Sequence, residues 1–185
     1  MLHLMRHGAP AVEGRLLGRT DDPATPAGIA DGVARASGLT IERVVSSDLR
    51  RASASAEAIA APRGLAVEID PRWRELDFGE WDGVAPSSID PIDFARFHDD
   101  PDGAAPPGGE RWSSLRDRVS HALDAVPAEP TLVVTHGGPM RAALAIACGF
   151  DRRQVWAFDL PYTALLSLRL WPGEERFVQI VGLAT

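Results

Sequence analysis

The stretch TLVVTHGG, residues 131–138, reads as a short buried strand that runs into a histidine and two glycines. Residues 1–8, MLHLMRHG, repeat the pattern, since an apolar strand ends and delivers His7 and Gly8. Ligands of open α/β sheets bind outside the carboxyl ends of the strands, so His7 and His136 would face one crevice if their strands are neighbours. Glycine lets the backbone after each histidine turn tightly and approach a ligand closely. Such an arrangement suits phosphate chemistry at an imidazole.

Outward from these two stretches, predicted strands and helices alternate along the chain. Helices are expected over residues 26–36, 48–61, 89–97, 110–126 and 139–148, and strands over residues 1–5, 43–46, 65–69, 131–135, 164–170 and 176–181. The last two strands would be joined at Pro172-Gly173-Glu174 as a hairpin. This alternation predicts an α/β fold: a single three-layer α/β/α domain with a mostly parallel central sheet and helices on both faces.

Glycine and proline interrupt residues 79–109 so often that loops around one short helix are expected there. We predict one domain over residues 1–185, in which residues 79–110 form a loop and helix insertion over the active site.

Composition limits the classes of partner. The net charge is -7, with 26 acidic and 19 basic residues, which argues against nucleic acid, because binders of phosphate backbones present a basic face. No apolar run approaches the roughly 20 residues that span a bilayer, and no secretory leader is visible, so a cytoplasmic protein with no membrane partner is expected. The single cysteine, Cys148, excludes an intrachain disulfide and a cysteine-based zinc site. A homodimer is left open.

Four sequence blocks carry a resemblance to a known family. They are, in order, Arg6-His7-Gly8, residues 46–57 (SSDLRRASASAE), residues 75–83 (ELDFGEWDG) and residues 134–138 (VTHGG). The blocks resemble the signatures of the histidine phosphatase superfamily, the phosphoglycerate-mutase-like group. The resemblance implies a phosphoglycerate-mutase-like fold and a metal-independent phosphomonoesterase that needs no cofactor and acts on a small phosphorylated metabolite.

The resemblance also assigns roles to individual residues. His7 would be the nucleophile, whose phosphohistidine is then hydrolysed by water. Arg6, Arg51 and His136 would hold the phosphoryl oxygens, because phosphoryl transfer depends on placement and on opposite charge. Glu75 would protonate the leaving group and later activate water, and the like charge of bound phosphate would favour its protonated form.

Further phosphate contacts are expected from Gly8, Arg19, Thr20 and Gly137. Gly137 leads into the helix predicted over residues 139–148, whose free N-terminal amides and positive dipole end favour an anion. Two neighbours compete for assigned roles, Arg50 with Arg51 and Glu80 with Glu75. The remaining histidines, His3, His98 and His121, are interpreted as bystanders, with a place on the substrate side as the alternative for His98, and the five tryptophans as core or rim residues.

The substrate is less clearly indicated. Ala9, Pro10 and Glu13 replace residues that are common in the family, which puts part of its usual phosphate pocket in doubt. Short phosphatase-type members of this shape are similar to alpha-ribazole phosphatases. The aspartates of residues 83–110 argue against a doubly anionic phosphoglycerate. Three alternatives stay open: a phosphoglycerate-type mutase, a catalytically silent phosphoryl-binding or interaction module, and a metal hydrolase, which chelators would inhibit.

Overall fold

A six-stranded mixed sheet runs through the protein, in the order β3-β2-β4-β1-β5-β6. The computed structural model describes residues 1–171 and 177–185. The strands are β1 (Leu2–Arg6), β2 (Arg43–Ser46), β3 (Val67–Ile69), β4 (Thr131–Thr135), β5 (Leu165–Trp171) and β6 (Phe177–Ala184). Strands β1 to β4 pair in parallel, whereas β5 is antiparallel to both β1 and β6. The proposed turn at 172–174 lies outside the described residues.

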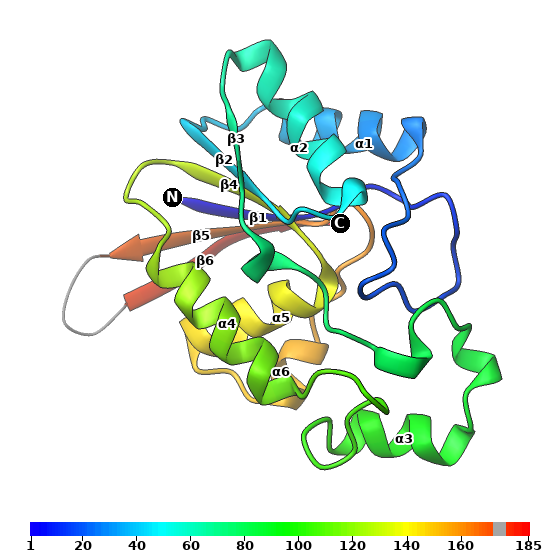
Figure 1. Ribbon diagram of the computed structural model, residues 1–185. Helices are drawn as coiled ribbons and strands as arrows, with labels where there is room; N and C mark the ends of the chain where they lie inside the picture. The colour runs from blue at the N-terminus through cyan, green and yellow to red at the C-terminus, as the bar shows by residue number, and fades with distance from the viewer. Residues whose placement is uncertain (172–176) are drawn as a thin grey trace.

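Helices cover both faces of this sheet, so the predicted α/β fold is confirmed (Figure 1). One face carries α1 (Pro26–Ala36) and α2 (Arg50–Ala60), and the other carries α4 (Trp112–Asp124), α5 (Gly137–Cys148) and α6 (Arg152–Trp156). Within the described ranges, no helix combines the length and the apolar character that crossing a bilayer would need.

Observed boundaries stay close to the predicted ones where the chain carries a clear start signal. Thr25 caps α1 by accepting the Gly28 N–H at 3.0 Å, and Pro26 occupies the first turn. Helix α5 begins at Gly137 rather than Pro139, because the two glycines already adopt helical geometry.

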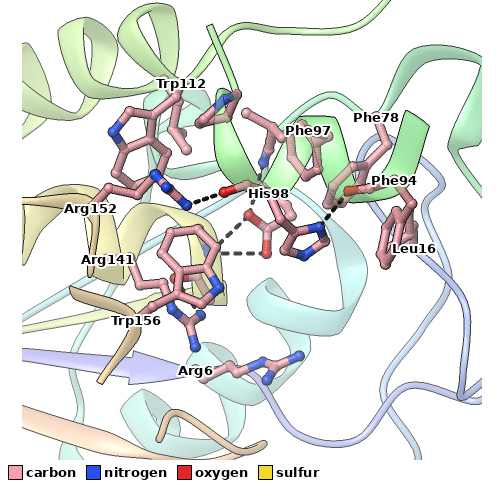
Figure 2. A pocket seen from close by; sticks show the side chains of 16 residues that line it. Arg6, Leu16, Phe78, Phe94, Phe97, His98, Trp112, Arg141, Arg152 and Trp156 are labelled. Carbon is pink, nitrogen blue, oxygen red and sulfur yellow. Dashed lines mark hydrogen bonds between the residues drawn. The ribbon is translucent and has the colours of Figure 1, made fainter. Parts of the chain in front are cut away.

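Helix α6 was not predicted. Its five residues are too few to show a helical period, although Asp151 and Gln154 form a capping box at its start. Residues 79–110 contain the expected short helix, α3 (Pro91–Asp99), preceded by two 3-10 turns, Gly79–Trp81 and Pro86–Ser88. Helices α3 and α6 both contribute side chains to a single pocket (Figure 2).

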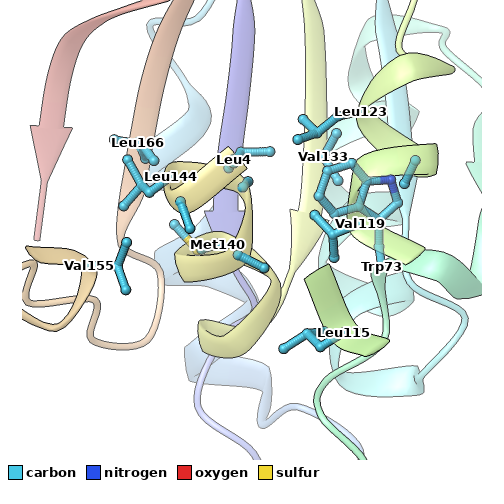
Figure 3. Packing of buried hydrophobic residues seen from close by; sticks show 14 of the residues in the cluster. Leu4, Trp73, Leu115, Val119, Leu123, Val133, Met140, Leu144, Val155 and Leu166 are labelled. Carbon is cyan, nitrogen blue, oxygen red and sulfur yellow. The ribbon is translucent and has the colours of Figure 1, made fainter. Parts of the chain in front are cut away.

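The core is split between the two faces of the sheet, because neighbouring strand residues point in opposite directions. Leu4 and Val133 pack with Met140 and Leu144 of α5 (Figure 3), whereas Met5 belongs to the cluster on the α1 and α2 side. Strands that are buried on both faces need a continuous apolar run. The two stretches that end in His7 and His136 meet that requirement.

Replacement of Leu144 by alanine is expected to lower the free energy of unfolding by about 2–5 kcal/mol, because it leaves a cavity in the α5 layer. Leu144 has no exposed surface and lies in the larger core cluster. Urea denaturation of Leu144→Ala measures the loss. Ile92, which is 63% exposed, provides the control, and Ile92→Ala should stay within about 0.5 kcal/mol of the wild type. Equal losses for both variants would contradict this packing.

Candidate active site

Parallel pairing of β1 with β4 brings the two histidines together. Arg6 lies opposite Thr135 in this pairing, so His7 and His136 both follow the last paired residues. The His7 N–H donates to the Thr135 carbonyl at 2.9 Å. The two imidazole ring centroids are 4.9 Å apart, and both side chains are buried. The strands that end in His7 and His136 are therefore neighbours, which is the condition under which both histidines were expected to face one crevice.

The hydrogen bond of His7 fixes which ring nitrogen carries the proton. Nδ1 lies 2.7 Å from the carbonyl oxygen of Gly8, and a carbonyl only accepts, so the proton is on Nδ1 and the lone pair on Nε2. Burial lowers the pKa of His7 well below its usual value, and the nearby charges of Arg51 and Arg6 lower it further, against the opposing effect of the Gly8 bond. His7 is therefore a neutral imidazole whose Nε2 can act as a nucleophile.

His136 offers its other nitrogen to a ligand. Its Nε2 lies 3.0 Å from Oγ of Ser47, which itself accepts the Leu49 N–H at 3.3 Å. The Ser47 hydroxyl can still donate to Nε2, and in that arrangement the His136 ring proton is on Nδ1. That atom is buried and has no partner among the described residues. Burial lowers the pKa of His136 well below its usual value, and its titration is coupled to that of His7 and to the nearby charges of Arg51 and Arg6.

Arg51 is a fully buried cation held by backbone oxygens. Its Nη1 donates to Thr20 at 2.6 Å, and its Nη2 donates to Leu17 at 2.8 Å and Gly18 at 2.9 Å. Its Nε has no partner within the described part of the chain. The neighbouring Arg50 is exposed and pairs with Asp21. Of the two arginines considered for phosphate binding, only Arg51 is buried near the histidines, whereas Arg50 lies on the surface.

Arg6 is held in a similar way. Nη1 donates to the Leu160 carbonyl at 2.7 Å, and the guanidinium carbon lies 4.3 Å from the centroid of the Tyr162 ring. Its Nε is also buried without a partner in the described ranges. A buried donor that stays unsatisfied costs about 1–3 kcal/mol. An anionic ligand could satisfy the unpaired nitrogen atoms of Arg6, Arg51 and His136.

Glu75 lies at the N-terminus of α5. Its Oε1 accepts the N–H groups of Gly138 at 3.0 Å and of Leu76 at 2.9 Å. A side chain at position 138 would overlap this carboxylate, which explains the second glycine after His136. Arg118 donates to the Glu75 carbonyl at 2.9 Å and fixes the backbone behind the carboxyl group. The competing Glu80 is exposed.

The four additional phosphate contacts expected from the sequence lie in different settings. Gly137 lines the pocket at the start of α5. The Gly8 carbonyl accepts the hydrogen bond from Nδ1–H of His7. A Cβ on Gly8 would overlap the carbonyl oxygen of Gly28 in α1.

Arg19 and Thr20 belong to a loop that the Asp82 carboxylate holds through their N–H groups at 2.9 and 2.7 Å. Arg19 pairs with Asp77 at 3.4 Å, and the Thr20 residue is exposed. Neither lines the pocket of Figure 2, and neither do His7, Arg51 and His136, so the phosphate contacts of all five stay predictions.

A pocket of about 170 Å³ adjoins Arg6 and Glu75. Figure 2 shows aromatic side chains around it, Phe94 and Phe97 from α3 and Trp156 from α6 among them. His98 also lines the pocket, whereas His3 and His121 are not among its lining residues, so the substrate-side alternative for His98 stays a prediction.

The aspartates of residues 83–110 do not line this pocket, because the loop and α3 direct them elsewhere. The sequence argument against a doubly anionic substrate therefore loses its basis.

Two arginines of the pocket wall, Arg141 and Arg152, were not singled out from the sequence. Arg141 follows Gly137 by four residues, so it lies on the same helix face, and this spacing could have revealed it. Arg152 belongs to the unpredicted α6 and donates to the His98 carbonyl, so no signal in the sequence connects it with α3.

No group of three or more histidine, cysteine, aspartate or glutamate side chains is placed to hold a metal ion, as far as residues 1–171 and 177–185 show. The charged groups that act on His7 are the guanidinium groups of Arg51 and Arg6. They suit an anion rather than a cation.

A family model described as the histidine phosphatase superfamily (branch 1) matches residues 2–181. The chain belongs to the histidine phosphatase superfamily. The resemblance carried by the four sequence blocks is thereby confirmed. The match covers every described element up to and including most of β6.

Named relatives in this superfamily differ in substrate. Phosphoserine phosphatase 1 of Hydrogenobacter thermophilus is 31% identical over 125 residues, which span 64% of this chain and 59% of that enzyme. The probable phosphoglycerate mutase GpmB of Cronobacter sakazakii is 34% identical over 149 residues, spanning 74% of this chain and 69% of that protein. The solved structure of mycobacterial glucosyl-3-phosphoglycerate phosphatase is 25% identical, with a TM-score of 0.85 over 97% of this chain and 96% of that one. These names do not select one substrate for this member.

Lowering the pH below 6.5 is expected to reduce the free energy of unfolding. The pKa values of His7 and His136 are lowered from 6.5 in the folded protein, so below that pH the unfolded chain binds more protons. The stabilisation is complete above pH 6.5 and is lost as the pH falls toward the lowered values. Urea denaturation between about pH 8 and pH 5.5 measures this slope. It should flatten in His7→Gln but not in His121→Gln, an exposed control, and an unchanged slope in both would contradict the assignment.

Proposed function

We propose that this protein is a metal-independent phosphomonoesterase that acts on a small phosphorylated metabolite through a phosphohistidine on His7. The observation that carries the proposal is the geometry of the two buried, adjacent histidines, of which His7 is neutral with its lone pair on Nε2. The unpaired donors of Arg6, Arg51 and His136 around them fit the oxygens of a phosphoryl group.

In the first step, Nε2 of His7 attacks the phosphorus atom. A P–N bond forms, and the ester P–O bond breaks with its electron pair on the leaving oxygen. Glu75 transfers a proton to that oxygen. Arg6, Arg51 and the Nδ1–H of His136 stabilise the charge on the three remaining oxygens, because catalysis of phosphoryl transfer is mostly positioning and electrostatics.

In the second step, water attacks the phosphohistidine. Glu75, now a carboxylate, takes a proton from this water, the P–N bond breaks, and its electron pair returns to Nε2 of His7. Inorganic phosphate leaves, and the starting enzyme is restored. The scheme uses no metal and no cofactor.

The substrate proposed at finer detail is a phosphate ester similar to alpha-ribazole phosphate. The aromatic lining of the pocket supports a leaving group with a planar, apolar part. The net charge of -7 supports a small molecule over nucleic acid, and the proposed location is the cytoplasm. The proposed contacts of Gly8, Arg19, Thr20 and Gly137 with phosphate complete this site.

A phosphoglycerate-type mutase is the second candidate, favoured by the 34% identity to a probable phosphoglycerate mutase. A mutase returns the phosphoryl group to the sugar acid, whereas a phosphatase releases inorganic phosphate. Incubation with 3-phosphoglycerate and analysis of the products separates the two. A catalytically silent module would do neither.

Replacement of His7 by alanine is expected to abolish phosphate release, because the nucleophile is removed. The assay measures inorganic phosphate from p-nitrophenyl phosphate, sugar phosphates, nucleotides, phosphoglycerates and alpha-ribazole phosphate, with a chelator present throughout. His121→Ala, an exposed histidine, should retain wild-type rates. Turnover by folded His7→Ala, or wild-type activity that the chelator removes, would contradict the mechanism.

Glu75→Gln is expected to slow turnover most for poor leaving groups, because these depend on a proton donor. The ratio of kcat/KM for an alkyl phosphate to that for p-nitrophenyl phosphate should fall by about 10-fold or more relative to the wild type. Glu80→Gln is the matched control on an exposed carboxylate. An equal loss for good and poor leaving groups would count against Glu75 as the acid.

A further inference from the structure

Arg141 is a cation with weak partners at the wall of the pocket. Its Nη1 and Nη2 each lie 3.4 Å from a backbone oxygen, those of Gly137 and Phe158, which is long for a hydrogen bond. Its Nε is buried and has no partner in the described part of the chain. Arg6 and Arg51, by contrast, each make at least one hydrogen bond of 2.7 Å or shorter. Arg141 therefore keeps donor capacity for a ligand.

The position of Arg141 is set by two neighbours. A methyl group added to Gly137 would lie 3.1 Å from Nη1 of Arg141 and 3.9 Å from the guanidinium carbon of Arg6. The two cations therefore flank the same turn of α5. On the opposite side, the Arg141 guanidinium carbon lies 5.0 Å from the centroid of the Trp156 ring (Figure 2). Arg141 thus lies between the proposed phosphoryl site and the aromatic part of the pocket.

Positive charges outnumber negative ones in the lining of the pocket, and the carboxylates that act on the charge of Arg141 are those of Glu75 and Asp159. Among the described lining residues, Arg6, Arg141 and Arg152 are cationic, and Glu75 is the one carboxylate. Glu75 is held by N–H groups of residues 76 and 138, and the mechanism uses it as the acid. The remaining walls are mostly apolar and aromatic. A second anion on the substrate would meet this charge.

We propose that Arg141 is a specificity-determining residue that binds a second anionic group, carried on an apolar leaving group of the substrate. This inference rests on the proposed phosphomonoesterase function, and it favours a different substrate class from an ester similar to alpha-ribazole phosphate, which carries no second anion. The ligand is a phosphate ester whose alcohol or phenol bears a carboxylate or another anion. Arg6 and Arg51 hold the phosphoryl group that is transferred, and Arg141 holds the part that leaves.

The test compares two aryl phosphates that differ in charge and little in shape, 4-carboxyphenyl phosphate and 4-carbamoylphenyl phosphate. For each substrate, kcat/KM of a variant is divided by that of the wild type, so that the different reactivities of the two esters cancel. The variants are Arg141→Gln and Arg141→Lys. The control is Arg153→Gln, which removes an exposed arginine of α6. Circular dichroism and thermal melting confirm that each variant is folded.

Arg141→Gln is expected to lower kcat/KM for the carboxylated ester by about 10- to 100-fold, the loss of one charge-assisted hydrogen bond. Its effect on the carbamoyl ester should stay within about 3-fold. Arg141→Lys, which keeps the charge, should recover part of the loss, and Arg153→Gln should change neither ester. This pattern supports the inference, because a purely structural role of Arg141 would affect both esters alike.

Equal losses on both esters would overturn the inference, since Arg141 would then serve the transferred phosphoryl group or the fold. Unchanged rates on both would overturn it as well. If the wild type hydrolyses both esters, either of these two results would reject the role of Arg141 but would still support the phosphomonoesterase function. Failure of the wild type to hydrolyse any phosphate ester would reject the proposed function, and the inference with it.

Discussion

The parallel pairing of β1 with β4 is the constraint on which the rest of the site depends. The two strands are buried on both faces, and their backbone bonds continue past the paired residues to the His7 N–H. A slip of one residue in this register would turn each side chain to the opposite face of the sheet. His7 and His136 would then no longer face each other. The helices on both faces of the sheet bury these strands, and in doing so they fix the separation between the two imidazole rings.

The Arg6 and Arg51 side chains donate their hydrogen bonds to backbone carbonyls, while the nearby carboxylates act on Arg51 from a distance. The guanidinium groups of Arg6 and Arg51 are held by carbonyl oxygens of residues 17, 18, 20 and 160. Carbonyl groups fix a cation without neutralising it, so the positive potential is kept for a ligand. Burial, together with this potential, lowers the pKa of His7 and keeps the ring neutral, as the proposed role of nucleophile requires. One arrangement of charges thus both attracts the phosphoryl group and prepares the atom that attacks it.

Sequence reasoning succeeded where local signals are strong. The apolar runs before His7 and His136 predicted both strands, and Thr25 and Pro26 predicted the start of α1. It failed where the outcome depends on the path of a loop. The direction of the aspartates in residues 83–110, and the place of His98 in the pocket, follow from how α3 docks. Helix α6 has too few residues for a periodic pattern, so Arg152 could not be placed in advance.

The contact between Gly8 and Gly28 links the surface of the protein to its chemistry. Helix α1 approaches the loop after His7 so closely that neither position leaves room for a side chain. The outer face of α1 can vary during evolution at little cost, whereas a change on the face toward Gly8 shifts the carbonyl that holds the His7 proton. Two adjacent residues of one helix can therefore have opposite tolerance to mutation. In a laboratory evolution experiment, substitutions on the outer face of α1 would be mostly neutral, whereas substitutions on the face toward Gly8 would mostly inactivate the protein.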